Sequence, residues 1–409
     1  MAQNNLPIVF DAGTGYIKIG FGGDNFPMYS IPAILGRPML RYNQKIDDIE
    51  LKEIMVGDEA APYQAMLELS KPVEEGIVKN WDDMEIIWDY CFKKVKQNTQ
   101  GSTILMTEAV LNPDENKKNM AELLFEKFQF GRMQIGIQAL LSLYAEGLQT
   151  GILLDAGDGV THCIPVYENF ILGHLVQRMN IAGRHLTQYL VKLLFRRYIY
   201  IKKYIYKQIT YRGYAFNSTA DFEQIRTLKE KLCYVSGDLD VDRELANETT
   251  CLEKEYKFPD GTSIKIGRER FEAPELLFNP CFDGHSFGGV HNMVFDVIQK
   301  CEIDLRSKMY QNILISGGTT TFPGFPTRLQ NEVIKLYKKE ILKNKSYKDS
   351  KIKVKVIDPP NRMYNVFIGG AVLAKIMQNQ DRFWVSKQDY DEIGKDRIIS
   401  KFQSSSLYF

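Results

Sequence analysis

Two aspartates with the same neighbours stand half a chain apart. Asp11 and Asp155 each end a short apolar run and precede Ala-Gly-x-Gly, in IVFDAGTGYIK (residues 8–18) and LLDAGDGVTH (residues 153–162). A Gly-x-Gly turn lets the backbone approach a ligand closely, and its successive N–H groups form a concave anion site. Carboxylate oxygens are the ligands that Mg²⁺ prefers. The two segments therefore predict a magnesium nucleotide whose phosphates lie between two hairpins.

Three further side chains in these segments suit phosphate. Thr14 and Asp158 occupy the x positions of the two turns, and Lys18 lies on the first return strand. A lysine there can meet β- or γ-phosphate oxygens as a point charge. The alternative is that each segment is only a tight hairpin, because short glycine motifs recur by chance. Two copies favour the phosphate site, and their spacing predicts a duplicated domain whose halves face each other.

Other segments are compatible with the same site. ISGGTTTFPG (residues 315–324) is a glycine turn after a strand and could cover a nucleotide with its backbone. Arg226, Lys229 and Glu230 share one face of an expected helix, and taken alone they fit a solvated surface pair better than a ribose clamp. His162 and Gln138 could orient a water beside a γ-phosphate, although a lone histidine is more often structural.

Alternating strand-like and helix-like segments must position these residues. Short apolar runs predict strands over 7–10, 16–21, 152–156 and 313–315. Helical patterns predict helices over 81–94, 119–128, 138–146, 183–195, 220–235, 324–342 and 366–376. Mixed elements of this kind indicate an α/β protein with helix-covered sheets.

Length and composition bound the class of protein. A chain of 409 residues suits two large lobes or several subdomains, and a net charge of +1 argues against a nucleic-acid partner. The amino terminus has no signal-peptide pattern, and no apolar run reaches the roughly 20 residues of a membrane span. Six cysteines without a CxxC pair suggest reduced, buried thiols. We expect a soluble intracellular protein.

Seven motifs resemble the actin superfamily, in the order of that family and over nearly the whole chain. They are DAGTGYIKIGFGGD, GDEA, GIVKNWDDMEIIW, LLDAGDGVTH, LKEKLCYV, ISGGTTTFPG and FIGGAVLA. The resemblance implies an actin-like ATPase fold, with two lobes of mixed sheets flanked by helices around a nucleotide cleft. It implies four subdomains, made of residues 1–33, 72–145 and 365–409; 34–71; 146–181 and 286–364; and 182–285.

The resemblance also implies ATP and Mg²⁺ as cofactors, and assigns residue roles. Asp11 and Asp155 would hold magnesium through water, and Gln138 and His162 would position the attacking water. The nucleotide-binding residues would be Thr14, Gly15, Tyr16, Lys18, Asp158, Gly159, Val160, Gly183, Arg226, Thr227, Leu228, Lys229, Glu230, Gly317, Gly318, Thr319, Thr320, Thr321, Phe322 and Met363. Turnover would be slow, because in this family the nucleotide serves mainly as a conformational switch.

Several positions depart from conventional actin, and three of them lie beside the expected nucleotide. Ala12 and Ala156 stand where actin carries polar residues beside its phosphate loops, and Met363 stands where the family usually has a lysine near adenine. The departures leave both aspartates and Lys18 in place. We therefore expect ATP binding more firmly than hydrolysis.

Three segments resemble one actin-related subfamily, whose members are a subunit of the complex that nucleates branched actin filaments. The segments are residues 36–60, residues 212–226 and the linker before residues 353–362. Members of this subfamily act as a template subunit at the pointed end of the daughter filament. The implied partners are actin-related protein 3, the other complex subunits, actin and nucleation-promoting factors, in the cytoplasm and cytoskeleton. The alternatives are a conventional or nuclear actin-related protein, a phosphotransferase such as a sugar kinase, and a chaperone ATPase of the same fold.

The segment FRRYIYIKKYIYKQITY (residues 195–211) has no counterpart in the family pattern. Three interpretations stay open. It is a genuine surface extension that contacts a partner, an extension without a role, or a translated intron from an A+T-rich gene.

Overall fold

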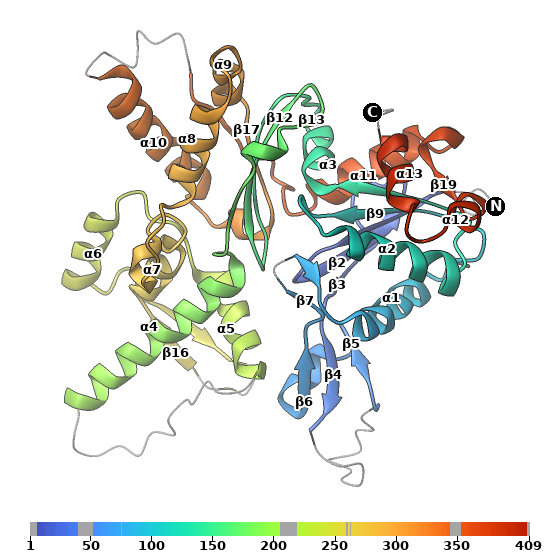
Figure 1. The fold of residues 1–409 in the computed structure, drawn as a ribbon. Coiled ribbons are helices and arrows are strands. Elements are labelled where there is room, and N and C mark those ends of the chain that lie inside the picture. The colour runs from blue at the N-terminus through green and yellow to red at the C-terminus, as the bar shows by residue number, and fades with distance from the viewer. Residues whose placement is uncertain are drawn as a thin grey trace.

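The computed structural model describes residues 6–39, 52–74, 76–204, 219–258, 261, 263–343 and 353–406, and two large sheets organise them. The first has the order β19-β10-β9-β1-β2-β3, formed by Val385–Ser386, Arg132–Ile137, Thr103–Glu108, Ile8–Ala12, Tyr16–Phe21 and Tyr29–Pro32. The second has the order β13-β12-β11-β17-β18 with β14 beside β12, formed by Phe170–Ile171, Thr161–Tyr167, Gly151–Ala156, Ile313–Ser316, Val356–Ile357 and Gln177–Met179. Helices flank both sheets (Figure 1), which confirms the predicted α/β class.

The two sheets repeat one local pattern. In the first, β1 pairs antiparallel with β2, with Asp11 opposite Lys18, and parallel with β9. In the second, β11 pairs antiparallel with β12, with Asp155 opposite His162, and parallel with β17. The two DAGxG segments of the sequence therefore form two equivalent hairpins, each at the centre of its own sheet.

The first lobe, in the right-hand part of Figure 1, surrounds the first sheet. Its helices are α1 (Trp81–Val95), α2 (Asp114–Glu122) with the following turn Leu123–Lys127, α12 (Lys387–Ile393) and α13 (Ile398–Ser406). The side chain of Asn80 caps α1 by accepting from the backbone N–H of Asp83, and Trp88 on the buried face of α1 packs edge-on against Phe10 of β1. This apolar face fixes α1 against β1, the strand that carries Asp11.

A smaller unit extends from the first lobe. It contains β4 (Leu35–Pro38), β5 (Met55–Val56) and β6 (Leu67–Ser70), with a 3₁₀ turn at Ala61–Met66 and the hairpin β7 (Val73–Glu74) and β8 (Ile77–Val78) nearby. Its own apolar cluster includes Ile34, Met55 and Leu67. The loop after Arg41, which carries part of the subfamily resemblance, lies outside the described residues.

The second lobe is mainly helical around the second sheet. Its elements are α4 (Gly183–Tyr204), α5 (Thr219–Leu232), α6 (Leu239–Glu248), α7 (Glu269–Glu275), α8 (Val290–Lys300), α9 (Ile303–Gln311), α10 (Phe325–Tyr337) and the hairpin β15 (Lys254–Lys257) and β16 (Ser263–Ile266). The helix predicted over 183–195 continues to Tyr204, into the segment without a family counterpart. Residues 205–211 of that segment lie outside the described residues.

Two helices cross between the lobes. α3 (Gln138–Ala145) follows β10 of the first sheet and leads to β11 of the second, and it packs against α11 (Asn365–Ile376). The helices touch at Gly369, where a Cβ atom would lie 1.8 Å from the carbonyl oxygen of Leu141. Only glycine permits this close approach, so the contact sets how the two sheets sit relative to each other.

Two predictions made from the whole sequence can be compared with the described residues. Among the described residues, no helix is both long and apolar enough to cross a bilayer. Of the six free cysteines, Cys251 and Cys281 are exposed and the other four are buried. The prediction that all six thiols are buried is therefore wrong for these two; Cys251 lies between α6 and β15, and Cys281 lies between α7 and α8.

Candidate nucleotide site

A cleft of about 610 Å³ lies between the lobes, and both Gly-x-Gly turns line it. The turns come close together, because a Cβ atom on Gly15 would lie 3.0 Å from the Cβ of Asp158. Residues from β1, β2, β11, the start of α4, α5 and the turn after β17 share this cavity. The predicted meeting of the two hairpins across a cleft is thus present in the structure.

Asp11 is buried at the base of the cleft, and protein donors engage both of its oxygens. Lys18 Nζ lies 2.8 Å from Oδ2, while Thr107 Oγ1 and Gln138 Nε2 donate to Oδ1 at 2.7 and 3.2 Å. A carboxylate held in this way is fixed in orientation. It suits contact with a metal ion through that ion's water shell better than direct ligation.

Of the two aspartates, Asp155 has less compensating positive charge around its carboxylate than Asp11 has. Burial raises its pKa to about 6, the nearby charge of Asp11 adds to the rise, and Lys18 opposes it. An ionised carboxylate in such a place is stabilised by any added cation. Two aspartates that share one lysine therefore form a donor set that fits a hydrated Mg²⁺.

The second hairpin is tied to two neighbouring segments. The backbone N–H groups of Gly183 and Arg184, at the start of α4, donate to the carbonyl oxygens of Gly157 and Asp158 at 3.0 and 2.9 Å. Thr319 Oγ1 donates to the carbonyl oxygen of Gly157 at 2.6 Å. These bonds hold the turn, the helix N-terminus and the segment after β17 as one rigid wall.

Glycines keep that wall compact at two points. A Cβ atom on Gly183 would lie 2.8 Å from Thr319 Oγ1, and one on Gly317 would lie 2.2 Å from the carbonyl oxygen of Ala156. Gly317 also has φ of 90°, which favours glycine. Both positions therefore depend on the missing side chain to leave room in the cleft.

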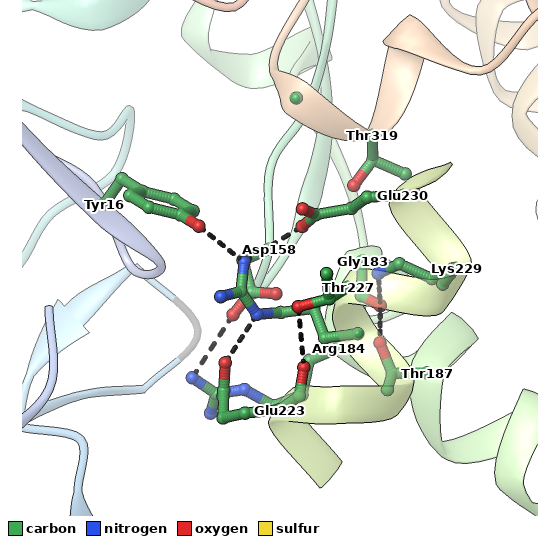
Figure 2. Close-up of polar contacts among 12 residues, drawn as sticks. Tyr16, Asp158, Gly183, Arg184, Thr187, Glu223, Thr227, Lys229, Glu230 and Thr319 are labelled. Atoms are coloured by element: carbon green, nitrogen blue, oxygen red, sulfur yellow. Dashed lines mark hydrogen bonds and ion pairs between the residues drawn. The ribbon is translucent and has the colours of Figure 1, made fainter. Parts of the chain in front are cut away.

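Charged residues of α5 line the cleft, and Figure 2 shows Lys229 extending towards Gly183 at the start of α4. Lys229 is buried and donates to the carbonyl oxygen of Gly183 at 2.6 Å. Arg226 donates to Glu223, Tyr16 and Glu230 at 2.6, 2.8 and 2.9 Å. The interpretation as a solvated surface pair is therefore wrong for Lys229, which is buried, and for Arg226, whose side chain is 16% exposed, because packing of α5 turns both inward. Glu230 keeps an exposed side chain, as that interpretation expected.

Gln138 and His162 lie in the same cavity as the aspartates. The amide nitrogen of Gln138 is used by Asp11 and Thr107, which leaves its oxygen to accept from a water. His162 is 4% exposed, and burial, with the charge of Arg178 adding to it, lowers its pKa to about 4. A neutral imidazole at pH 7 can orient a water, but it is a weak base.

The lowered pKa of His162 predicts that the folded protein loses stability in acid. Between pH 6.5 and 4 the unfolded chain protonates His162 while the folded protein does not, so stability falls as the pH falls through that window. From pH 7 to pH 5 we expect the native protein to lose about 2 kcal/mol more unfolding free energy than His162→Gln. Urea unfolding at both pH values measures the difference. His174→Gln, at an exposed position, should behave like the native protein, and an equal loss in His162→Gln would contradict the prediction.

Most of the predicted site residues line the cleft, and three do not. The side chain of Leu228 belongs to the apolar core of the second lobe. The hydroxyl of Thr227 bonds back to the carbonyl oxygen of Glu223, and that of Thr320 to the carbonyl oxygen of Gly317. Helical geometry explains the first two, because the residues on either side of them face the cleft instead.

Among the charged residues that line the cleft, two were not predicted. Glu223 lies one helical turn before Arg226, and this i, i+3 spacing was a usable signal. Lys71 follows β6 and reaches the cleft from the small unit of the first lobe. No local pattern marks Lys71, since its partner stands 152 positions further along the chain.

Two equivalent hairpins facing each other across a cleft between two mixed sheets, with an aspartate at the end of each central strand, define an actin-like nucleotide site. The family model for actin matches residues 2–403, and the chain belongs to the actin family. It is similar to actin-related protein 2 of Saccharomyces cerevisiae, with 48% identity over 97% of this chain and 98% of the relative. It is also similar to actin-related protein 2 of Drosophila melanogaster, with 47% identity over 98% of both chains. The third such relative is from Acanthamoeba castellanii, with 46% identity over 98% of this chain and all of the relative.

Proposed function

We propose that this chain is the ATP-binding subunit of an actin-related protein 2/3 complex, which nucleates branched actin filaments. In it, the chain acts as a template subunit at the pointed end of the daughter filament. The observation that carries the proposal is the similarity to three actin-related protein 2 chains over almost their whole length. Actin-related protein 3, the other complex subunits, actin and nucleation-promoting factors are then its partners, in the cytoplasm and the actin cytoskeleton.

The cleft would hold ATP with its phosphates between the two hairpins. Thr14, Lys18 and Asp158 lie at the phosphate end, with Gly183, Lys229 and Met363 around the ribose and base. Asp11 and Asp155 would hold Mg²⁺ through water, and the bound ion would neutralise charge on the phosphate oxygens. Met363 is partly exposed beside Gly318, so it offers the base an apolar, adaptable contact.

Hydrolysis in this site would be slow. Gln138 and His162 can orient a water, but a primary amide is no base and His162 is a weak one. Ala12 and Ala156 donate no side-chain hydrogen bond to the phosphate loops. The nucleotide would then act through the arrangement of the lobes, which form the four subdomains 1–33 with 72–145 and 365–409, 34–71, 146–181 with 286–364, and 182–285.

A phosphotransferase of the same fold is less well supported. Such an enzyme needs a free carboxylate base beside the phosphates. Among the described cleft residues, Asp11 is engaged by Lys18, Asp158 has Arg184 at 3.5 Å, and Glu223 is paired with two cations. Glu230 is paired with Arg226, and the remaining cleft carboxylate, Asp155, is the one assigned to Mg²⁺ above, so the site offers no additional carboxylate base.

Affinity purification tests the proposal. We expect the tagged full-length chain to recover an actin-related protein 3 homologue and the small complex subunits from its own cells in equal amounts. The purified assembly should shorten the lag of actin polymerisation when a nucleation-promoting factor is added. Conventional actin with the same tag is the control. Recovery of actin alone, or of a nuclear assembly, would refute the proposal.

A further inference from the structure

A chain of polar contacts joins the two lobes across the cleft. Lys71, in the first lobe, places Nζ 2.6 Å from Glu223 Oε1 on α5 of the second lobe. Arg226, one turn further along α5, donates to the hydroxyl oxygen of Tyr16 on β2 at 2.8 Å. Figure 2 shows Tyr16 on one side and Glu223 and Glu230 on the other. All of these residues line the cleft that contains the two hairpins.

Each contact has a second component. The guanidinium of Arg226 lies 5.2 Å from the centre of the Tyr16 ring, and Lys71 Nζ lies 5.5 Å from the centre of the Phe222 ring on α5. Both arrangements are cation–π contacts. The lobes are thus linked at two points, each combining a charged hydrogen bond with a ring.

Burial strengthens the ion pairs that Glu223 makes. Glu223 is 5% exposed, and its two oxygens face one cation each, Lys71 and Arg226. Burial raises the pKa of Glu223, but the two cations outweigh it and the net shift is downward. Loss of Lys71 leaves one oxygen of the buried Glu223 without its cation, which weakens the closed arrangement.

The contacts made by α5 differ in whether they depend on the other lobe. When the lobes separate, Lys71 and Tyr16 leave α5, whereas Arg226 keeps Glu223 and Glu230, which lie on the same helix three and four positions away. The α5 side therefore retains a compensated cluster after opening. Separation of the lobes would therefore leave no buried charge on α5 without a partner.

We propose that Lys71 and Tyr16, held by Glu223 and Arg226, form an interlobe latch that limits the rate at which nucleotide leaves the cleft. The latch regulates the nucleotide site proposed above and rests on that proposal. Its four members line the cavity in which the nucleotide would lie and join its two sides, so opening of the cleft requires both contacts to break. Because Lys71 is partly exposed, salt weakens the latch.

The test measures release of a fluorescent etheno-ATP from the full-length protein with its accompanying subunits, in Mg²⁺, after a chase with excess ATP. Lys71→Gln is expected to release the analogue roughly tenfold faster, as for loss of one desolvated charge contact. Lys71→Arg should retain slow release. The matched control is Lys52→Gln, because Lys52 pairs with Glu59 at 2.8 Å within one lobe and does not cross the cleft.

Tyr16→Phe supplies a second variant that keeps the ring and removes only the hydroxyl, and it should release the analogue roughly threefold faster. Raising the salt from about 0.05 M to about 0.5 M should accelerate release from the native protein more than from Lys71→Gln. Unchanged release in both variants, with normal binding, would overturn the latch and leave the nucleotide site standing. Failure of the native protein to bind the analogue would refute the site and the latch together.

Discussion

Replacing Asp155 with asparagine is expected to stabilise the nucleotide-free protein at pH 7 and to remove most of the stabilisation that ATP and Mg²⁺ give it. Burial, together with the charge of Asp11, raises the pKa of Asp155 to about 6. The folded state therefore favours the protonated carboxyl, and stability is lost as the pH rises through 6. A neutral amide of the same shape avoids roughly 2–3 kcal/mol of this cost.

The same substitution removes a negative charge from the proposed magnesium site. At a ligand concentration of about 100 times Kd, binding stabilises a protein by about 2.7 kcal/mol, and most of this should disappear in Asp155→Asn. Thermal unfolding with and without MgATP measures both effects. Asp283→Asn is the control, because its partner Lys192 lies outside the cleft.

Lys18→Ala should give a different result. It also loses the effect of MgATP, but it lowers the stability of the nucleotide-free protein, because buried Asp11 is left with two neutral donors and no cation. Opposite changes in nucleotide-free stability with a shared loss of ligand response would identify the aspartates as a cation site. An unchanged response to MgATP in both variants would refute that assignment.

Gly369→Ala is expected to be among the most destabilising single substitutions in the chain. Its Cβ would lie 1.8 Å from the backbone oxygen of Leu141, so α11 and α3 must move apart. A backbone atom cannot turn aside as a side chain can, and we expect a cost above about 4 kcal/mol, despite the gain in helix propensity of about 1 kcal/mol. Because α3 begins at Gln138, the displacement also disturbs the contact of Gln138 with Asp11.

Substitutions at two other glycines serve as controls for Gly369→Ala. A Cβ at Gly370, the next residue, would meet only side-chain methyl groups, the nearest that of Val9 at 3.1 Å, and one at Gly173 would meet nothing within 4 Å. The losses in melting temperature should therefore rank Gly369→Ala first, Gly370→Ala second and Gly173→Ala last. Equal effects at Gly369 and Gly173 would show that the helix contact carries little energy.

Local chemistry in the sequence determined much of the site. The two DAGxG segments give hairpins because an apolar run, a glycine turn and a return strand suffice for one, and β1–β2 and β11–β12 follow this pattern. Helix patterns placed α1 and α3 to within a residue or two, since capping and amphipathic spacing are local properties. Gln138, His162 and both aspartates could be singled out for the same reason.

The tertiary structure alone decided how residues distant in the chain combine. Lys71 and Glu223 meet because two lobes close on each other, and neither residue carries a sign of the other in its own neighbourhood. Packing of α5 turned Arg226 and Lys229 inward, against the local preference of such residues for solvent. A pattern of residue types reports the preferences of one segment, whereas burial and charge pairing depend on which segments come together.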